Sequence, residues 1–267
     1  MRRVRRGGWR GVAVDDGDPL LGRILEQPDA GRSLPGFTIL KDERSVTVYS
    51  VGSGDGRLCV KEHRPGNLAR RLRRSRARTA FKLARAALEL NLRVAEPLAA
   101  LDIRSWGLWR RGLMVTRFVA GLEPLPEAGP NMPARRRLRL ARELADAVRR
   151  LHDGGWVHAD LKLYNLKVDR ERRPWLFDLE RGYRVGSWPA PARHLAQAID
   201  LAKLMASSAA AASRRERLEF LARYLRGTRR ARRRRVLKVL RFYSAGPARR
   251  QGKTLLEIAL WPKRPPQ

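Results

Sequence analysis

The sequence predicts an α+β fold with two lobes, a β-rich first third and a helical remainder. Short runs rich in β-branched and aromatic residues fill the first part. Longer stretches with apolar residues at helical spacing fill the second. A length of 267 residues with 43% hydrophobic residues is enough to build a core for such a layout.

The β-rich part is predicted from residue 37 onward. Strands are expected at residues 37–40, 46–51 and 57–61, and the run Gly52-Ser53-Gly54-Asp55-Gly56 predicts a hairpin between the last two. A helix at about 67–91 and strands at 94–103 and 113–119 follow. Residues 1–35 are rich in Arg, Gly and Asp with little periodicity, which predicts a basic, loosely structured lead-in.

The helical part begins with a helix at about 134–151, which is expected to stop at Asp153-Gly154-Gly155. Short strands at 157–158, 166–168 and 175–177 precede helices at about 192–207, 213–226 and 229–243. We therefore divide the chain into the lead-in at 1–35, an N-lobe at 36–120 and a C-lobe at 121–267.

The formal net charge of +33 predicts a polyanionic partner. Nucleic acid, an anionic membrane face and an anionic glycolipid all fit this charge, although an arginine-rich genome would also produce it. The charge is concentrated at Arg70–Arg78, Arg135–Arg142 and Arg229–Arg235. Almost no aromatic residues interleave with these clusters, so base stacking, and with it nucleic-acid binding, is disfavoured.

The single cysteine, Cys59, excludes an internal disulfide and a multi-cysteine zinc site. It lies in the apolar run Leu58-Cys59-Val60, which predicts a buried strand residue in a protein of the reducing cytoplasm. The N-terminus lacks the apolar stretch of a signal peptide. The most apolar long window, Leu195 to Ala212, contains Asp200 and Lys203, so we expect neither export nor a membrane span.

The informative motif is His158-Ala159-Asp160-Leu161-Lys162-Leu163-Tyr164-Asn165, followed by Phe177-Asp178-Leu179-Glu180. It resembles the catalytic loop H-x-D-L-K-x-x-N and the D-F-G motif of protein-kinase-like enzymes. The spacings also agree, with 5 residues from Asp160 to Asn165 and 13 from Asn165 to Asp178. The resemblance implies a bilobal protein-kinase-like fold that binds ATP.

The chemistry of phosphoryl transfer suits these residue types. Asp160 would orient the acceptor hydroxyl and take its proton, and Lys162 would stabilise the γ-phosphoryl group. The side chains of Asn165 and Asp178 offer hard oxygen ligands for Mg²⁺ bound to the ATP phosphates. His158 is expected to be a structural histidine that braces the loop.

The N-lobe supplies the other expected nucleotide contacts. Lys61 stands where the family has the strand lysine that binds the α- and β-phosphates, although an isolated strand lysine would be solvated. The block from Gly112 to Gly121 resembles the strand and hinge beside adenine, so backbone groups from Arg117 to Val119 are expected to bind the base. No glycine-rich loop precedes Lys61, and Ser45 with nearby backbone amides is expected to cover the phosphates instead.

Four points of the comparison with the kinase pattern need stating. The helix glutamate that should pair with Lys61 is missing, because the aligned position is near Ala80 and Glu89 lies about two turns further on. Glu180 replaces the glycine of D-F-G. Asp200 either anchors the catalytic loop from a core helix or lies on a helix surface, and no A-P-E signature follows Asp178.

Within the superfamily, the chain is most similar to the lipopolysaccharide kinases of the Kdo/WaaP type. The similarity rests on Val60-Lys61, the arginine-rich stretch ending in Ala80-Phe81-Lys82, Pro97-Leu98-Ala99, Met114-Val115-Thr116, the catalytic loop and Leu176 to Gly182. It spans roughly 37–207.

The resemblance implies an ATP- and Mg²⁺-dependent kinase of a bacterial lipopolysaccharide-core sugar, Kdo or heptose. The anionic glycolipid would be reached from the cytoplasmic face of the inner membrane, on which the helix at 229–243 could lie. The alternatives are a small-molecule or protein kinase of the same fold, and a weakly catalytic protein that binds anionic lipid or nucleic acid.

Overall fold

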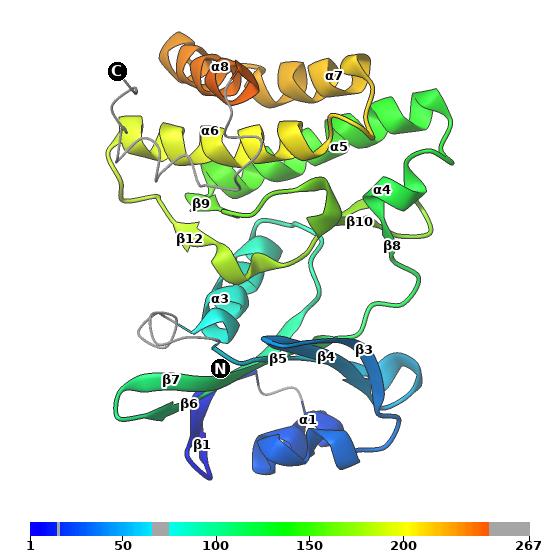
Figure 1. The fold of residues 1–267 in the computed structure, drawn as a ribbon, viewed down its shortest axis with the longest axis vertical. Coiled ribbons are helices and arrows are strands. Elements are labelled where there is room, and N and C mark those ends of the chain that lie inside the picture. Colours follow the sequence, from blue (N-terminus) through cyan, green and yellow to red (C-terminus); the bar gives the residue numbers. More distant parts are fainter. Residues whose placement is uncertain (15–16, 66–74, 246–267) are drawn as a thin grey trace, which may run out of the picture. The chain divides into compact units, whose positions relative to one another are not determined.

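The structure is a computed structural model that describes residues 1–14, 17–65 and 75–245. The chain divides into two compact units. The N-terminal unit comprises Met1–Leu122, Asp169–Glu171 and Trp175–Tyr183, and the C-terminal unit comprises Glu123–Val168, Arg172–Pro174 and Arg184–Gln267. The N-terminal unit is β-rich and the C-terminal unit is mostly helical (Figure 1), which confirms the predicted α+β, protein-kinase-like fold.

A seven-stranded antiparallel sheet forms the N-terminal unit, in the order β1-β2-β6-β7-β5-β4-β3. The strands are β1 (Arg2–Arg6), β2 (Trp9–Ala13), β3 (Thr38–Glu43), β4 (Val46–Val51), β5 (Leu58–His63), β6 (Pro97–Ser105) and β7 (Leu108–Arg117). The turn η2 (Gly54–Gly56) joins β4 to β5, so the hairpin predicted from the glycine-rich run is confirmed.

The prediction of a loose lead-in at residues 1–35 is wrong for the described residues. They form β1, β2, helix α1 (Pro19–Glu26) and the 3-10 helix η1 (Pro28–Ser33). Trp9, Leu21 and Ile24 are buried in the same core cluster as Val60 of β5. The arginines of β1 occupy its exposed positions, and Val4 is its one buried residue. With a single apolar residue among four arginines, the segment lacks the alternation of apolar and polar residues by which a strand is recognised.

Helix α3 (Arg76–Glu89) covers part of the sheet and contacts β5, β6 and β7. Its N-cap is Ser75, whose hydroxyl accepts a hydrogen bond from the backbone N–H of Arg78 at 3.2 Å. The predicted helix began at about residue 67. Residues 66–74, which include most of the Arg70–Arg78 cluster, lie outside the described residues.

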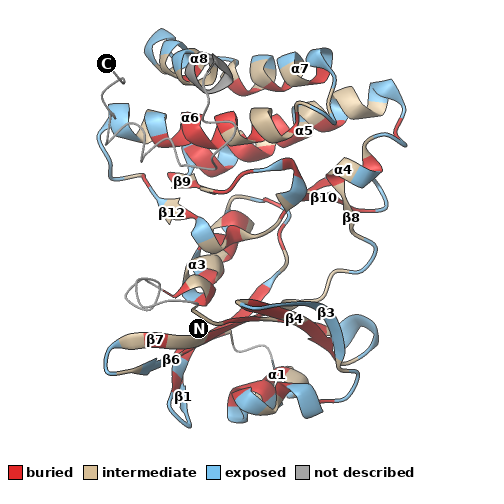
Figure 2. Ribbon diagram, in the orientation of Figure 1, coloured by how far each residue is buried: buried red, intermediate tan, exposed pale blue. Residues whose placement is uncertain are grey.

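The C-terminal unit is built on α5 (Ala134–Asp153), α6 (Ala190–Ser207), α7 (Arg214–Leu225) and α8 (Arg230–Ala245). Helix α5 packs on α7, and α6 packs on α8. Smaller elements are β8 (Glu123–Pro124), α4 (Leu125–Ala128), β9 (Trp156–Val157), η3 (Leu163–Asn165) and β10 (Leu166–Val168). The turn η4 (Leu179–Arg181) and most of the strand β11 (Pro174–Leu176) belong to the N-terminal unit, and along the chain the strand β12 (Tyr183–Arg184) passes from one unit to the other. Figure 2 shows the buried stripes of α5 and α6 in red.

The apolar side of α8 is used inside the C-terminal unit. Val236 is fully buried, and Val239 and Leu240 pack against Ile199 and Ala202 of α6. These side chains are therefore covered by protein, which corrects the expectation that this helix offers them to a membrane leaflet. Among the described residues, none of the helices combines the length and apolarity that a membrane crossing requires.

Cys59 also differs from its prediction. It lies on β5 as expected, but it is only partly buried, whereas its neighbours Leu58 and Val60 are fully buried. Successive strand residues face opposite sides of a sheet, and only the side of Leu58 and Val60 meets the main core.

Burial of α1 predicts that the first 35 residues contribute to stability. Replacing the fully buried Ile24 with Ala should lower the free energy of unfolding by about 2–5 kcal/mol, as for other large-to-small core changes. Urea unfolding measures this. The matched control, Ile39→Ala on a strand position that is 49% exposed, should change stability by less than ~0.5 kcal/mol. Equal effects of the two changes would contradict the placement of α1 in the core.

Candidate functional site

Lys61 is held by two carboxylates within the N-terminal unit. Its Nζ lies 2.6 Å from Oδ1 of Asp178 and 2.6 Å from Oε1 of Glu180. The Lys61 side chain is 27% exposed, and burial alone would lower its pKa, but the charges of Glu180 and Asp178 outweigh burial and raise it. Lys61 is therefore a fixed cation and not the solvated strand lysine of the alternative interpretation.

Two features of the backbone bring these side chains together. Lys61 occupies the middle of β5, where it is opposite Val48 of β4 and Met114 of β7. Asp178 adopts the left-handed conformation at φ 59° and ψ 49°, and the turn η4 that follows it packs against α3. Aspartate tolerates this region better than most residues, so the turn can direct Asp178 and Glu180 toward β5.

Glu180 answers the open question of which residue pairs with Lys61. Its Oε2 lies 3.6 Å from Nη1 of Arg76, in the first turn of α3, and 3.3 Å from Nδ1 of His63. The helix thus supplies a cation, and the acidic partner comes from the position of the D-F-G glycine. Burial raises the pKa of Glu180, but its hydrogen bonding with Asp178 and the charges of Lys61 and Arg76 outweigh burial and lower it.

His63 is the neutral member of this group. It is 1% exposed, and burial, reinforced by the positive charges of Lys61 and Arg76, lowers its pKa to about 3. Sequence reasoning missed both His63 and Arg76. His63 could have been found from its position two residues after Lys61, on the same face of the strand.

Within the C-terminal unit, the predicted catalytic loop is closely connected. Nζ of Lys162 lies 2.9 Å from Oδ1 of Asp160, and Nδ2 of Asn165 donates to the backbone oxygen of Asp160 at 2.8 Å. Asp160 is 8% exposed, whereas the Lys162 side chain is 48% exposed. The structure thus brings Asp160, Lys162 and Asn165 together.

Asp200 anchors this loop from α6. It is 1% exposed, and its Oδ2 accepts a hydrogen bond from the backbone N–H of His158 at 2.6 Å. The same oxygen lies 3.3 Å from Nε2 of His152, whose Nδ1 is 2.8 Å from the hydroxyl of Tyr224. The core-helix interpretation is therefore confirmed, and the helix-surface alternative is wrong. His158 itself is fully buried, as its structural role requires.

The backbone before Asp160 is constrained as well. Ala159 has φ 62°, a conformation that residues with a Cβ seldom adopt. Nζ of Lys203, on α6, donates to the Ala159 carbonyl oxygen, and Ser207 accepts a hydrogen bond from the N–H of Leu163 at 2.9 Å. Contacts from α6 therefore hold the backbone both before and after Asp160, the predicted base.

The remaining predicted nucleotide contacts lie on the sheet of the N-terminal unit. Ser45 is in the β3–β4 turn, where its carbonyl oxygen accepts from the N–H of Arg64 at 2.9 Å. The N–H of Arg117 donates to Glu96, and its guanidinium pairs with Asp18. Val119 follows the end of β7. The side chain and the N–H of Arg117 are therefore committed within the protein, and the N–H of Phe118 donates to the carbonyl oxygen of Arg57 at 3.0 Å. A base could use only the remaining backbone groups of this stretch.

The residues proposed for magnesium fit that ion by their chemistry. Asn165 uses its amide nitrogen internally, so its carbonyl oxygen is the group that remains for a metal. The Asp178 side chain is 34% exposed and provides a carboxylate. Hard oxygen donors of this kind suit Mg²⁺. Among the described residues, no group of three or more His, Cys, Asp or Glu side chains could hold a metal.

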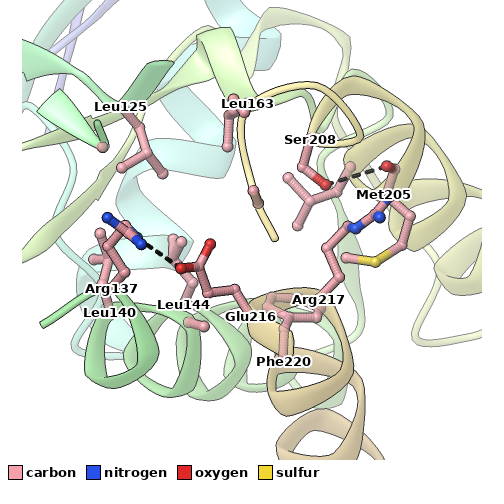
Figure 3. A pocket seen from close by; sticks show the side chains of 15 residues that line it. Leu125, Arg137, Leu140, Leu144, Leu163, Met205, Ser208, Glu216, Arg217 and Phe220 are labelled. Atoms are coloured by element: carbon pink, nitrogen blue, oxygen red, sulfur yellow. Dashed lines mark hydrogen bonds and ion pairs between the residues drawn. The ribbon is translucent and has the colours of Figure 1, made fainter. Parts of the chain in front are cut away.

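A pocket lies in the C-terminal unit (Figure 3). Its volume is about 590 Å³ when the open space at its mouth is included. Its apolar wall includes Leu125, Leu140, Leu144, Leu163, Leu204, Met205 and Phe220. The ion pair of Arg137 with Glu216, at 2.7 Å, crosses one side of it. Leu163 belongs to the catalytic loop, but none of the predicted site residues lines this pocket, and no sequence pattern pointed to it.

The strand lysine, the acidic turn and the anchored H-x-D-x-K-x-x-N loop place the chain among proteins of the protein-kinase-like fold. Residues 55–224 match the lipopolysaccharide kinase (Kdo/WaaP) family. The protein belongs to this family, so the resemblance read from the motifs is confirmed.

Individual relatives agree with this assignment. A 3-deoxy-D-manno-octulosonic acid kinase of Stenotrophomonas maltophilia is 32% identical over 131 residues, which cover 48% of this chain and 49% of the relative. Another, from Xanthomonas campestris pv. campestris, is 28% identical over 145 residues, covering 51% and 57%. The chain thus matches about half the length of these relatives.

The low pKa of His63 predicts a pH-dependent stability. Between about pH 6.5 and pH 3, the unfolded imidazole binds a proton and the folded one does not, so unfolding becomes easier as pH falls. For one full proton the slope is roughly 1.4 kcal/mol per pH unit. Replacing His63 with Gln should flatten this slope in urea unfolding measured across that range. Parallel curves for the two proteins would contradict the assignment of a neutral, buried His63.

Proposed function

We propose that this protein transfers the γ-phosphoryl group of ATP to a hydroxyl of 3-deoxy-D-manno-octulosonic acid (Kdo) in the lipopolysaccharide inner core. The observation behind the proposal is the fixed Lys61 cation, held by Asp178 and Glu180 on a kinase-like sheet. Family membership and the names of the relatives favour Kdo over heptose as the acceptor. The acceptor sugar is part of a membrane glycolipid, so we place the reaction at the cytoplasmic face of the inner membrane.

Each group of residues has a distinct task in this proposal. Lys61 binds the α- and β-phosphates as a fixed cation, and backbone groups from Arg117 to Val119 bind adenine, with Ser45 near the phosphates. Asn165 and Asp178 would each offer an oxygen ligand to Mg²⁺, and the ion would neutralise phosphate charge.

Asp160 acts as the base. It takes the proton of the acceptor hydroxyl, whose oxygen forms a bond to the γ-phosphorus while the bond to the β–γ bridging oxygen breaks and ADP leaves. Lys162 is 2.9 Å from Asp160 and exposed enough to reach the transferred phosphoryl group. Its charge offsets the negative charge there.

The direct test incubates the protein with radiolabelled ATP, Mg²⁺ and defined lipopolysaccharide-core acceptors. Label should enter the glycolipid when the acceptor carries Kdo with a free hydroxyl, and should be absent when Kdo is missing. Label in an acceptor that has heptose as its only phosphorylatable sugar would overturn the choice of Kdo. Incorporation into protein alone would favour a protein kinase.

Replacing Asp160 with Asn keeps the shape of the side chain but removes the base. The kcat for phosphate transfer should fall by about 10²–10⁴-fold, with KM for ATP changed little, because general-base catalysis contributes about that much. Steady-state kinetics with the labelled acceptor measures both. Asp146→Asn, at an α5 carboxylate paired with Arg223, is the control and should leave kcat unchanged. Full activity of the Asp160→Asn protein would show that another group is the base.

Replacing Glu180 with Gln removes one of the two negative charges that hold Lys61. The KM for ATP should rise roughly tenfold, equal to about 1.4 kcal/mol of binding, while Glu180→Asp should restore part of the loss. The control is Glu89→Gln at the end of α3, where the exposed carboxylate should have no effect. If Glu89→Gln raised the KM for ATP and Glu180→Gln did not, the assignment of Glu180 as the partner of Lys61 would be wrong.

A further inference from the structure

Two hairpins at one end of the N-terminal sheet form a positively charged surface, which we call the hairpin surface. It consists of the β1–β2 hairpin and the tip of the β6–β7 hairpin, where Trp106 lies. The register pairs Trp9 with Ile103 and Arg10 with Asp102, so both tips point toward the same end of the sheet. Figure 1 shows both hairpins projecting from that end, and Figure 2 shows their tips exposed.

The first hairpin carries a dense positive charge. Residues 1–14 contain five arginines and no acidic residue. Four of the arginines, on β1, are exposed, as is Arg10 on β2. Within the described part of the chain, all five side chains are exposed and none of them makes an ion pair.

The arginines of α5 behave differently, although the sequence singled them out. Arg137 pairs with Glu216 at 2.7 Å, and Arg142 pairs with Glu219 at 2.6 Å. Arg136 and Arg139 both pair with Glu143. The cluster at Arg135–Arg142 is therefore largely neutralised by the unit that contains it, and it is a poor candidate for an anion-binding surface.

Arg5 and Arg10 lie directly opposite each other on neighbouring antiparallel strands. Like charges in this position repel, and the pair becomes favourable when an anion lies between or above the two guanidinium groups. Arg3 is on the same face of β1, two residues away. The strand geometry thus places Arg3, Arg5 and Arg10 on one face, where their guanidinium groups can bind phosphate groups.

Trp106 adds an apolar element beside these cations. It is 94% exposed and has φ 54°, in a two-residue hairpin turn whose second residue, Gly107, has φ 73°. Such turns favour Asn or Gly, and a bulky residue there is unusual. The turn holds an indole in solvent at the tip of a hairpin. Tryptophan in this situation prefers the interface between lipid headgroups and acyl chains.

We propose that the hairpin surface docks this protein on an anionic phospholipid bilayer, with Trp106 entering the headgroup region and the β1 and β2 arginines binding lipid phosphates. A flat, repeating array of phosphates matches a row of unpaired guanidinium groups. Single-stranded nucleic acid is less suited, because it requires several aromatic platforms for stacking, and Trp9 and Trp109 are buried. The proposal rests on the membrane location given above for the acceptor, but vesicle binding can be measured without any kinase activity.

The test measures binding of the full chain to vesicles of phosphatidylethanolamine with phosphatidylglycerol, using vesicles of phosphatidylcholine as the uncharged reference. The triple variant Arg3→Gln, Arg5→Gln, Arg10→Gln should lose affinity on the order of a hundredfold, from the usual contribution of each basic residue near an anionic surface. Trp106→Ala should weaken binding several-fold and abolish quenching of tryptophan fluorescence by brominated lipid.

The matched control removes the same charge elsewhere. Arg230→Gln, Arg233→Gln, Arg234→Gln changes three exposed arginines of α8 and should alter affinity less than threefold. Equal losses in the two triple variants would mean that net charge, and not the hairpin surface, drives binding, and would overturn the proposal. Binding to a single-stranded oligonucleotide through Arg3, Arg5 and Arg10, without binding to the anionic vesicles, would also overturn it. Loss of vesicle binding with phosphate transfer to a soluble acceptor intact would separate this surface from the catalytic residues.

Discussion

The central constraint in this protein is the placement of the Lys61 ammonium between the carboxylates of Asp178 and Glu180. A cation on an inner strand of a sheet is stable only when acidic groups offset its desolvation. The same two carboxylates orient the amine, so the requirement for stability and the requirement for phosphate binding coincide. The turn η4, which follows the left-handed Asp178, packs against α3 beside this contact.

In this chain, an acidic partner of the strand lysine comes from the turn η4 and not from the helix α3. In the usual kinase arrangement, a glutamate on the helix pairs with the strand lysine. Here the first turn of α3 carries Arg76, and Glu180 lies between Arg76 and Lys61. The carboxylate of Glu180 still links the strand to the helix, but the helix now carries a cation and the turn carries the carboxylate. The orientation of the lysine is therefore still coupled to the helix, through one additional ion pair.

The catalytic loop illustrates a second form of support. Asp200 and Lys203 of α6 hold backbone groups of the loop, not its functional side chains. Backbone anchoring leaves Asp160 and Lys162 to interact with each other and with substrate.

The arginines divide into two groups. Those of α5 are paired internally with glutamates, whereas those of the first hairpin have no acidic partner among the described residues and are available for a polyanion.

The sequence by itself determined the fold class, most strands and helices, and the residues of the catalytic loop, because periodicity and motif spacing are local properties. It failed where a pattern was masked or a partner was distant. The arginines of β1 concealed a strand, and the apolar side of α8 was mistaken for a membrane face although α6 covers it. The partner of Lys61 lies 119 residues away along the chain. Only tertiary structure selects such a pair, because the pairing energy depends on distance and burial, which sequence separation does not encode.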